Sequence, residues 1–495
     1  MMQTTASERR AARYRAVWRW HFYAGLFCIP FVIWLATTGS IYLFKPQIDA
    51  LLERRYDHLQ IDGPLAPPSA QVAAALATQP GSVLNAYELP AMPSAAARVL
   101  IGHGSVITRV FVNPQTLQVL GSVPDEQRFT RLIFRLHGEL LLGARGSLLV
   151  ELAASWAIIM IVSGLFLWWP RQAQGAAGVL YPRLRRGGRV FWRDLHAVVG
   201  LWVSAFALFL LSSGLPWATF WGHNLQTVRS MFGPSTPMQQ DWSTGTADDL
   251  ALAAAQNTPA PTAHQDGMPM KDMKMSGMKM SGMKMPATPD DAPSSMPGMT
   301  AAEMAAMPGQ GNTGPFDAAA LDRLVPVIAA LHLPPPALIA PPSKAAPTWT
   351  ARSDTQDRPQ RVSLVLDGDA GRVVSRTDFD QRPMLDRIIG TGVAAHEGQL
   401  FGWPNQLLGL LTALGLMTLC VSALMMWWKR RPDGTLGAPL AVSGSTPRLV
   451  AFVAVAVLLG ILLPAMGISL VAVLLVERLV LRRIAPARAF LGLRA

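Results

Sequence analysis

Charged residues are scarce in this chain: only 15% of its 495 residues are Asp, Glu, Lys or Arg, whereas 51% are hydrophobic. A soluble protein of this length usually has about a quarter of its residues charged. The deficit lies in apolar stretches of roughly 20 residues, which is the length of a helix that crosses a bilayer. The composition therefore excludes a simple soluble enzyme and also a chain that only touches a membrane surface.

Cysteine is equally scarce, since Cys28 and Cys420 are the only two, and both lie inside apolar stretches. This excludes a disulfide framework, a CxxC metal site and the CxxCH motif that attaches haem covalently. No GxGxxG motif follows a predicted strand, so the sequence gives no sign of a built-in nicotinamide or flavin domain. An electron donor, if the chain needs one, is expected to be quinol or a separate cytoplasmic reductase.

The chain instead has six apolar stretches, near residues 20–44, 148–169, 197–220, 405–428, 449–463 and 467–481. The last two are either a tight hairpin or one broken segment. Lys and Arg cluster beside the stretches on one predicted side, so the net charge of +12 indicates topology and not nucleic-acid binding. This pattern predicts a mainly α-helical, multi-pass membrane protein in contact with the lipid bilayer, with both termini in the cytoplasm.

Two long segments between the spans are predicted on the side of the membrane opposite the cytoplasm. Both contain strand–turn–strand patterns, at 109–120 and 362–374. Such patterns predict small α+β domains. The predicted divisions are an N-terminal tail with the first span (1–45), a first outside domain (46–146), the second span (147–170), a basic cytoplasmic loop (171–192), the third span (193–221), a second outside domain (222–403) with a Met-rich disordered insert (264–312), the fourth span (404–430) and a C-terminal helical hairpin (447–483).

The plan of span, outside domain, histidine and span occurs twice. The matched intervals are His21 to Gly25 and His196 to Gly200 (4 residues), His21 to Gly39 and His196 to Gly214 (18), His137 to Gly143 and His396 to Gly402 (6), and His137 to Trp168 and His396 to Trp427 (31). A Trp-Arg dipeptide also precedes both His21 and His196. These intervals predict a duplicated two-span unit, repeated in parallel, that forms a four-helix bundle.

Four histidines at matched places in such a bundle favour a functional over a purely structural role. Burying an ionisable side chain in or beside a membrane span costs free energy, so such residues usually serve a function. Pseudo-twofold symmetry is expected to bring His21 to His196, and His137 to His396. Two facing histidines are what a six-coordinate haem b needs as axial ligands, so two haem b groups are predicted. Gly25 and Gly200 are expected to leave room for a porphyrin, and Arg19 and Arg193 to meet propionates. A proton relay or a metal site is the alternative.

A methionine-rich tract interrupts the second outside segment, where twelve of the 23 methionines lie between 268 and 307. Its regular core contains Met273, Met275, Met278, Met280, Met283 and Met285. Thioethers are soft ligands that select Cu(I), so weak copper binding is predicted here. The alternative is a low-complexity linker, and the interspersed lysines argue against high affinity.

These features resemble the PepSY-associated transmembrane family of bacterial inner-membrane proteins. The resemblance rests on the duplicated spans, the two hairpin turns at 113–114 and 367–371, the LHGELLLG segment at 136–143 and the Trp-Trp-Pro ending at 168–170. Membership implies a four-helix haem-binding core with PepSY-like domains in the periplasm. Some members look like di-haem reductases that release iron from ferric siderophores, with His21, His137, His196 and His396 in the positions of the axial ligands.

The function expected from residues and resemblance together is electron transfer from the cytoplasmic side, or from quinol, to a periplasmic metal complex. A ferric siderophore for iron uptake is the first candidate substrate, and Cu(II) is the second because of the Met-rich tract. A non-enzymatic PepSY sensor or protein-binding membrane factor remains a different class. A metal transporter ranks last, because the spans carry few acidic or thioether residues.

Overall fold

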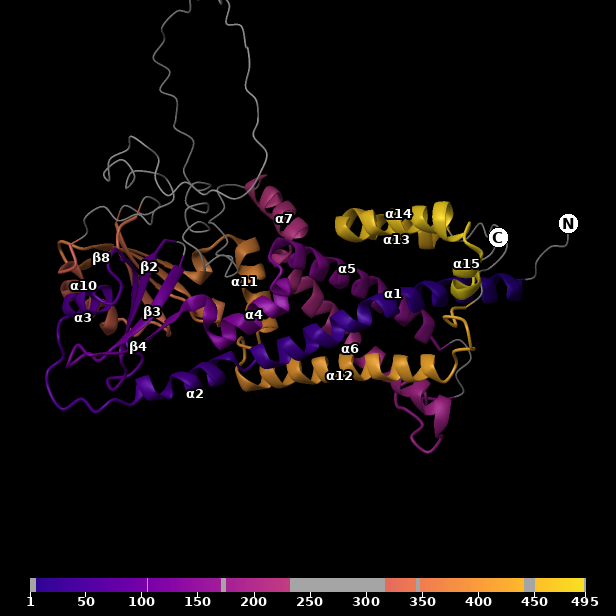
Figure 1. The fold of residues 1–495 in the computed structure, drawn as a ribbon, viewed down its shortest axis with the longest axis horizontal. Coiled ribbons are helices and arrows are strands. Elements are labelled where there is room, and N and C mark those ends of the chain that lie inside the picture. The colour runs from indigo at the N-terminus through magenta and orange to yellow at the C-terminus, as the bar shows by residue number, and fades with distance from the viewer. Residues whose placement is uncertain are drawn as a thin grey trace, which may run out of the picture.

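A computed structural model gives the fold of residues 6–104, 106–170, 175–231, 317–343, 348–439 and 450–493. A bundle of long helices forms one part of the molecule, and a β-sheet lies beyond one end of that bundle (Figure 1). We call this end of the bundle the sheet end. The opposite end, where Arg189, Arg193 and Arg430 line the interior, is called the arginine end.

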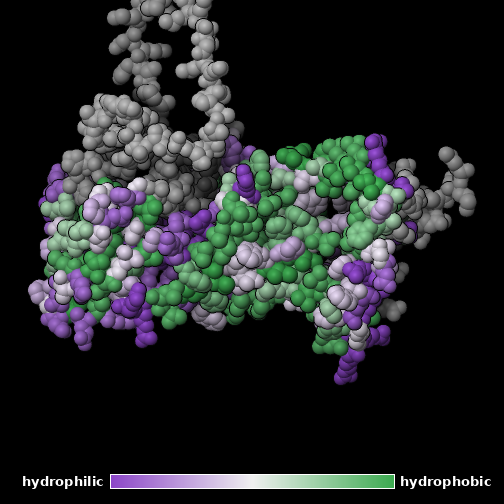
Figure 2. All heavy atoms as spheres, in the orientation of Figure 1, coloured by the Kyte–Doolittle hydropathy of each residue, from purple (hydrophilic) through white to green (hydrophobic). Residues whose placement is uncertain are grey.

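Four helices pack against one another to form the bundle: α1 (Ala6–Tyr42), α5 (Ala144–Trp168), α6 (Gly188–Gly214) and α12 (Trp403–Trp428). Within the described residues, five helical segments are long and apolar enough to cross a membrane, namely Tyr14–Tyr42, Ala144–Trp168, Gly188–Trp217, Trp403–Trp428 and Pro464–Leu481. Figure 2 shows hydrophobic residues covering the bundle between more polar ends. An apolar outer surface of this kind faces lipid, so the prediction of a multi-pass α-helical membrane protein is confirmed.

The C-terminal region forms a helical hairpin from α13 (Val450–Leu462) and α14 (Pro464–Val476), followed by α15 (Ala485–Leu491). The hairpin packs on α5, where the Trp156 indole donates a hydrogen bond to Ser469 Oγ at 3.0 Å. The described part of α13 covers most of the predicted fifth span. The predicted sixth span lies within Pro464–Leu481, a segment long and apolar enough to cross a membrane.

The strands form one antiparallel sheet of eight, in the order β4-β3-β2-β1-β5-β6-β7-β8. Their bounds are β1 (Val83–Glu88), β2 (Ala97–His103), β3 (Val106–Val112), β4 (Val119–Pro124), β5 (Ala337–Ala340), β6 (Trp349–Ser353), β7 (Val362–Asp367) and β8 (Arg372–Asp378). Both predicted hairpins are present, as β3–β4 and β7–β8. The two segments predicted as separate domains share this sheet, because β1 pairs with β5 through Tyr87–Ile339 and Glu88–Leu338.

One face of the sheet is covered by α3 (Pro68–Leu76) and α10 (Ala320–Ala330), one from each half of the repeat. Their apolar residues Val72, Leu321 and Leu324 are buried against alternate residues of the strands, as the two-residue period of a half-covered sheet requires. Asp322 also caps the start of α3, since its carboxylate accepts hydrogen bonds from the Ser69 amide and hydroxyl at 2.8 and 2.6 Å. These contacts join the two halves outside the membrane.

Shorter helices connect the sheet to the bundle: α2 (Lys45–Asp57), α4 (Phe129–Glu139), α7 (Thr219–Met231) and α11 (Met384–His396). Two of them, α4 and α11, return the chain from the sheet and carry His137 and His396 at their C-terminal ends. Hydrogen bonds from the bundle fix those ends, from the Trp34 indole to Leu136 O at 3.0 Å and from Asn405 Nδ2 to Ala395 O at 2.9 Å. The fold therefore delivers both histidines to the sheet end of the bundle.

Candidate functional site

A cavity of about 890 Å³ runs through the bundle between α1, α5, α6 and α12. All four predicted histidines, His21, His137, His196 and His396, line it. The wall is otherwise mostly apolar, which is typical of a binding site for a large, flat, apolar ligand with a few polar anchors.

The histidines come together in the two predicted pairs. The ring centres of His21 and His196 are 6.4 Å apart at the arginine end, and those of His137 and His396 are 6.4 Å apart at the sheet end. The two pairs lie at different depths. His137 contacts Thr38 of α1, 17 residues along that helix from His21, a separation of about 25 Å at the rise of an α-helix.

Each histidine uses its Nδ1 atom for a contact with a hydroxyl group of a neighbouring helix. The contacts are His21 to Ser163 at 2.9 Å, His137 to Thr38 at 3.0 Å, His196 to Ser422 at 3.1 Å and His396 to Ser213 at 2.9 Å. Each hydroxyl also hydrogen-bonds a carbonyl of its own helix: Met160, Trp34, Leu419 and Phe209 respectively. A hydroxyl has only one proton to donate, so it accepts a hydrogen bond from the imidazole.

This arrangement fixes the tautomer of all four rings, with the proton on Nδ1 and the lone pair on Nε2. His196 supports the same assignment independently, because its Nδ1 also lies 3.2 Å from the carbonyl oxygen of Leu419, which can only accept. A metal-binding histidine characteristically donates its other ring N–H in this way. Burial lowers the pKa of His137 and His396 to about 4, so both rings are neutral near pH 7, the form that binds metals.

The hydroxyl partners were not predicted, although the sequence contains their signal. Thr38 follows His21 by 17 residues and Ser213 follows His196 by 17, while Ser163 and Ser422 follow His137 and His396 by 26. The repeat therefore includes the hydrogen-bonding partner of each histidine as well as the histidine. The partners lie in the opposite half of the same two-span unit, so the fold is needed to see which hydroxyl meets which ring.

The separation of the rings fits a metal ion between them. An ion roughly 2 Å from each nitrogen, with each nitrogen roughly 1 Å from its ring centre, places the ring centres roughly 6 Å apart. No group of three or more His, Cys, Asp or Glu side chains suited to a metal ion occurs within the residues that the structure describes. Each site thus offers two imidazoles, fewer ligands than zinc requires but the number of axial positions on a haem iron.

Glycines allow the close approach of the imidazole rings to the helices. A Cβ atom on Gly39 would lie 3.1 Å from Cε1 of His137, and one on Gly164 would lie 3.2 Å from Cε1 of His21. Such distances are tighter than ordinary van der Waals contact, so larger side chains would displace the rings.

Gly25 and Gly200, predicted to leave room for a porphyrin, both line the cavity. A Cβ there would meet only the side chains of Met160 at 3.9 Å and Leu419 at 3.5 Å. Their proposed role beside a porphyrin stays a prediction.

The two predicted propionate arginines differ in their positions. Arg193 lines the cavity and also pairs with Asp194, at 2.6 Å from Nη2 to Oδ1. Arg19 instead donates hydrogen bonds to the carbonyl oxygens of Pro439 at 2.6 Å and Gly492 at 3.1 Å. It therefore holds the C-terminal segment and is not among the cavity-lining residues.

Arg19 and Arg193 point in different directions because they are placed one residue differently relative to the histidine that follows each of them. Arg193 precedes His196 by three residues, whereas Arg19 precedes His21 by only two. One residue turns a side chain by about 100° around an α-helix, which moves Arg19 off the face that carries His21. At the position three residues before His21 stands Trp18, which does line the cavity.

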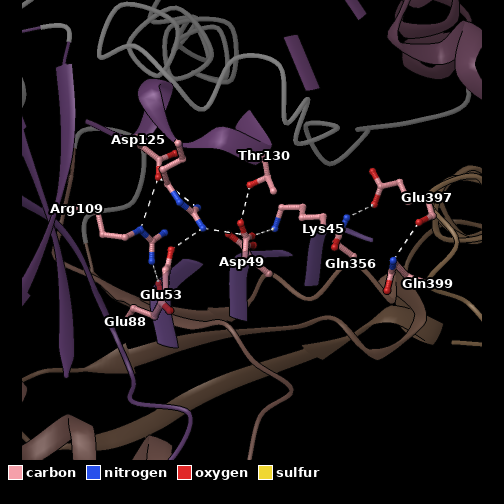
Figure 3. A network of polar contacts seen from close by, with 12 residues as sticks. Lys45, Asp49, Glu53, Glu88, Arg109, Asp125, Thr130, Gln356, Glu397 and Gln399 are labelled. Carbon is pink, nitrogen blue, oxygen red and sulfur yellow. Dashed lines mark hydrogen bonds and ion pairs between the residues drawn. The ribbon is translucent and has the colours of Figure 1, made fainter. Parts of the chain in front are cut away.

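The sheet end of the cavity is tied to the sheet by a network of ion pairs (Figure 3). Arg128, just before α4, binds Asp49 of α2 at 3.3 Å, and Thr130 donates a hydrogen bond to the same carboxylate at 2.7 Å. Burial alone raises the pKa of Asp49, but the charges of Lys45 and Arg128 and the Thr130 bond outweigh it and hold that pKa below its ordinary value. On the sheet side, Arg109 of β3 pairs with Glu88 of β1 and lies 3.7 Å from Asp125, which is in turn 3.6 Å from Arg128. The helix that carries His137 is therefore anchored to the sheet.

A corresponding set of contacts surrounds His396. Its neighbour Glu397 lines the cavity and accepts hydrogen bonds from Arg358 and Gln356, both at 3.4 Å. The Arg358 guanidinium also lies 5.7 Å from the ring centre of Trp217, another cavity-lining residue. These residues link the cavity to the second half of the sheet.

Glu151 is a buried carboxylate within α5. Its two oxygens accept hydrogen bonds from the backbone amides of Phe220 and Trp221, at 2.9 and 3.1 Å. It thus caps the N-terminus of α7, where free amides and the helix dipole favour a negative charge. This explains why a carboxylate is tolerated inside a spanning helix.

The predicted copper ligands Met273, Met275, Met278, Met280, Met283 and Met285 lie outside the described residues. The same holds for the whole insert at 264–312.

A family model described as the PepSY-associated TM region matches residues 18–430. No curated protein matches the chain. The matched region contains all four histidines, their hydroxyl partners and both halves of the sheet. The C-terminal hairpin lies beyond it.

Proposed function

The chain belongs to the family of the PepSY-associated TM region, and from this premise we propose that it is a di-haem b reductase of the bacterial inner membrane. The observation that carries the proposal is the two histidine pairs, whose ring centres are 6.4 Å apart and whose Nδ1 atoms each contact a hydroxyl, which leaves Nε2 available to bind a metal. When bound, haem b supplies a one-electron iron couple. Every other contribution comes from the residues of the chain.

In this proposal, His21 and His196 hold one iron at the arginine end, and His137 and His396 hold the other at the sheet end. Ser163, Ser422, Thr38 and Ser213 keep the four rings in the metal-binding tautomer and orientation. The apolar walls of α1, α5, α6 and α12 exclude water. The four helices thereby provide two redox sites at two depths of the membrane.

The placement of the arginines supports the proposed orientation in the membrane. Positive residues favour the cytoplasmic side of a membrane protein, so we assign the arginine end to the cytoplasm and the sheet to the periplasm. The donor is then a cytoplasmic reductase or quinol, and the acceptor is a metal complex bound near the sheet.

A ferric siderophore is the first substrate that we propose, as the resemblance to this family implies. One electron converts Fe(III) to Fe(II), whose lower charge binds oxygen ligands less strongly, so the chelator releases the metal. Cu(II) is the second candidate, because the product Cu(I) suits the thioethers of the Met-rich tract. A PepSY protein-binding factor without haem is the competing class.

The first test is an absorption spectrum of the purified protein, oxidised and then reduced by dithionite, with the haem content measured as the pyridine haemochrome. We expect two low-spin b haems per chain. His21→Ala or His196→Ala should remove one, and His137→Ala or His396→Ala the other, whereas the exposed His103 offers a matched control that should remove none. A colourless protein from haem-replete cells would contradict the proposal and favour the protein-binding class.

A second test separates the substrates. The dithionite-reduced protein is mixed with a ferric siderophore or with a Cu(II) chelate, and the rate of haem reoxidation is followed. Faster reoxidation by iron is expected. Deletion of 264–312 should leave the iron rate unchanged, and a selective loss of the copper rate would favour the copper function.

A further inference from the structure

Three arginine side chains line the arginine end of the cavity: Arg189 and Arg193 from α6 and Arg430 just after α12. Arg189 and Arg193 precede His196 by seven and three residues, which places all three side chains on one face of the helix. The cavity-lining carboxylates, Glu151 and Glu397, lie toward the sheet end and are bound by the contacts described above. The arginine end therefore carries an excess of positive charge.

One of the three arginines already has a carboxylate partner. Asp194 accepts ion pairs from Arg193 and Arg183, both at 2.6 Å, so its charge is shared between two guanidinium groups. In the portions of the chain with described structure, no carboxylate lies within ion-pair distance of Arg189 or Arg430. Two cations at the cavity thus have no anionic partner among the described residues.

Arg430 is held in place beside His21. Its guanidinium lies over the rings of Trp18 and Phe22, at 4.8 and 5.5 Å from their centres, and Nη2 donates a hydrogen bond to Gly437 O at 3.0 Å. Its Nε atom is buried and makes no hydrogen bond within the described structure. A buried donor without an acceptor is unfavourable, so this geometry suits an acceptor that comes from a ligand.

The charges around Arg430 also favour an anionic ligand. Burial lowers the pKa of Arg430, and the neighbouring charge of Arg189 lowers it further. Two nearby cations without a counter-charge among the described residues form a site that favours carboxylates, which guanidinium groups bind through charge-assisted hydrogen bonds.

We propose that Arg189 and Arg430 bind the two carboxylates of the cofactor held by His21 and His196. The inference rests on the proposed function, since haem b is a flat ligand with two propionate groups on one edge. The two arginines equal the two carboxylates in number and carry the opposite charge. The pairing also orients that edge toward the arginine end and leaves Arg193 with Asp194.

The two ends of the cavity differ in the cationic residues that line them. Within the described residues, no arginine or lysine lines the cavity near His137 and His396, where Glu397 is found instead. A cationic carboxylate anchor is therefore present at only one of the two sites. Loss of Arg189 or Arg430 should affect one haem and leave the other unchanged.

The test compares Arg430→Gln and Arg189→Gln with Arg186→Gln, which removes the same charge from an exposed residue that does not line the cavity. Apo-protein is reconstituted with haem b or with its dimethyl ester, whose propionates carry no charge. Wild-type protein should bind the ester about 10- to 100-fold more weakly at one site, as expected for the loss of charge-assisted hydrogen bonds. The two Gln variants should lose this discrimination, and Arg430→Lys should retain part of it.

A redox titration provides a second readout. Removal of a cation next to a haem disfavours the reduced, less positive iron, so the midpoint potential of one haem should fall in Arg430→Gln and not in Arg186→Gln. Equal binding of haem and ester by wild-type protein, or the same shift in the Arg186 control, would overturn this inference and leave the reductase proposal intact. A protein that binds no haem would overturn both.

Discussion

Thr38 offers a sharp test of how the chain orients its histidines. Its hydroxyl donates to Trp34 O at 2.9 Å and accepts from Nδ1 of His137 at 3.0 Å. Thr37, its neighbour on α1, makes the same kind of helical hydrogen bond, to Ile33 O at 2.7 Å, but faces outward and contacts no histidine. Replacement of either residue by Val keeps the shape of the side chain and removes the hydroxyl. The difference between the two variants therefore isolates the contact with His137.

The expected loss of haem affinity in Thr38→Val can be estimated from the hydrogen bond that is removed. A single hydrogen bond between neutral groups contributes about 0.5–1.5 kcal/mol, which corresponds to roughly a 2- to 13-fold change in an equilibrium constant. Loss of the partner of a metal-binding histidine typically costs about 10- to 100-fold in metal affinity, because the ring also loses its orientation. We expect Thr38→Val to weaken binding of the sheet-end haem by about tenfold.

The assay measures transfer of haem from each purified variant to an excess of a competing apo-globin. Two phases are expected in the wild-type protein, one for each site. The faster loss in Thr38→Val should affect one phase only, and it should be the phase that is absent from His137→Ala. Thr37→Val should match the wild-type protein in both phases.

Two outcomes would refute the reasoning. If Thr37→Val and Thr38→Val lose haem at the same rate, the effect comes from the helix and not from the contact with His137. If Thr38→Val accelerates the phase that depends on His21, the pairing of hydroxyls and histidines described here is wrong.

Three further predictions concern residues outside the histidine pairs. Asp49→Asn should lower stability at pH 7, and the difference from wild type should shrink as the pH falls below 3.8, because a carboxylate whose folded pKa is depressed loses its stabilising effect as the pH falls from its ordinary pKa through the folded value; a series of thermal unfolding curves in detergent from pH 7 downward measures this. Glu151→Ala leaves two amides of α7 without acceptors and should lower the free energy of unfolding by about 1–3 kcal/mol, with a smaller loss for Glu151→Gln in the same assay. Arg19→Gln should leave the content of both haems unchanged and increase proteolysis of the C-terminal segment, detected by mass spectrometry; loss of a haem would restore Arg19 to the cofactor site.

The pairing of the histidines could be predicted because the interval between residues on a helix survives duplication. Equal spacings from His21 and His196, and from His137 and His396, were sufficient to expect two facing pairs, and the structure brings these pairs together. The spans and both strand hairpins could likewise be predicted from local hydrophobic patterns.

Other features depended on contacts that no local pattern specifies. The union of both outer segments in one sheet rests on the short pairing of β1 with β5, across more than 200 residues of chain. The orientation of Arg19 depended on one residue of register. The interior role of Arg430 required the fold, because a basic residue that follows a span predicts topology and says nothing about which side of the helix it occupies.

The two halves of the repeat agree at some positions and differ at others, and the distribution is informative. They share the residues that a metal between two imidazoles requires, namely the histidine and its hydroxyl partner, with the same spacings in both halves. They differ at the arginine end of the cavity. Where α6 carries Arg189 and Arg193, the corresponding positions of α1 carry Tyr14 and Trp18. The duplicated histidine sites are therefore alike, whereas the positive charge at the arginine end comes from α6 and has no counterpart at these positions of α1.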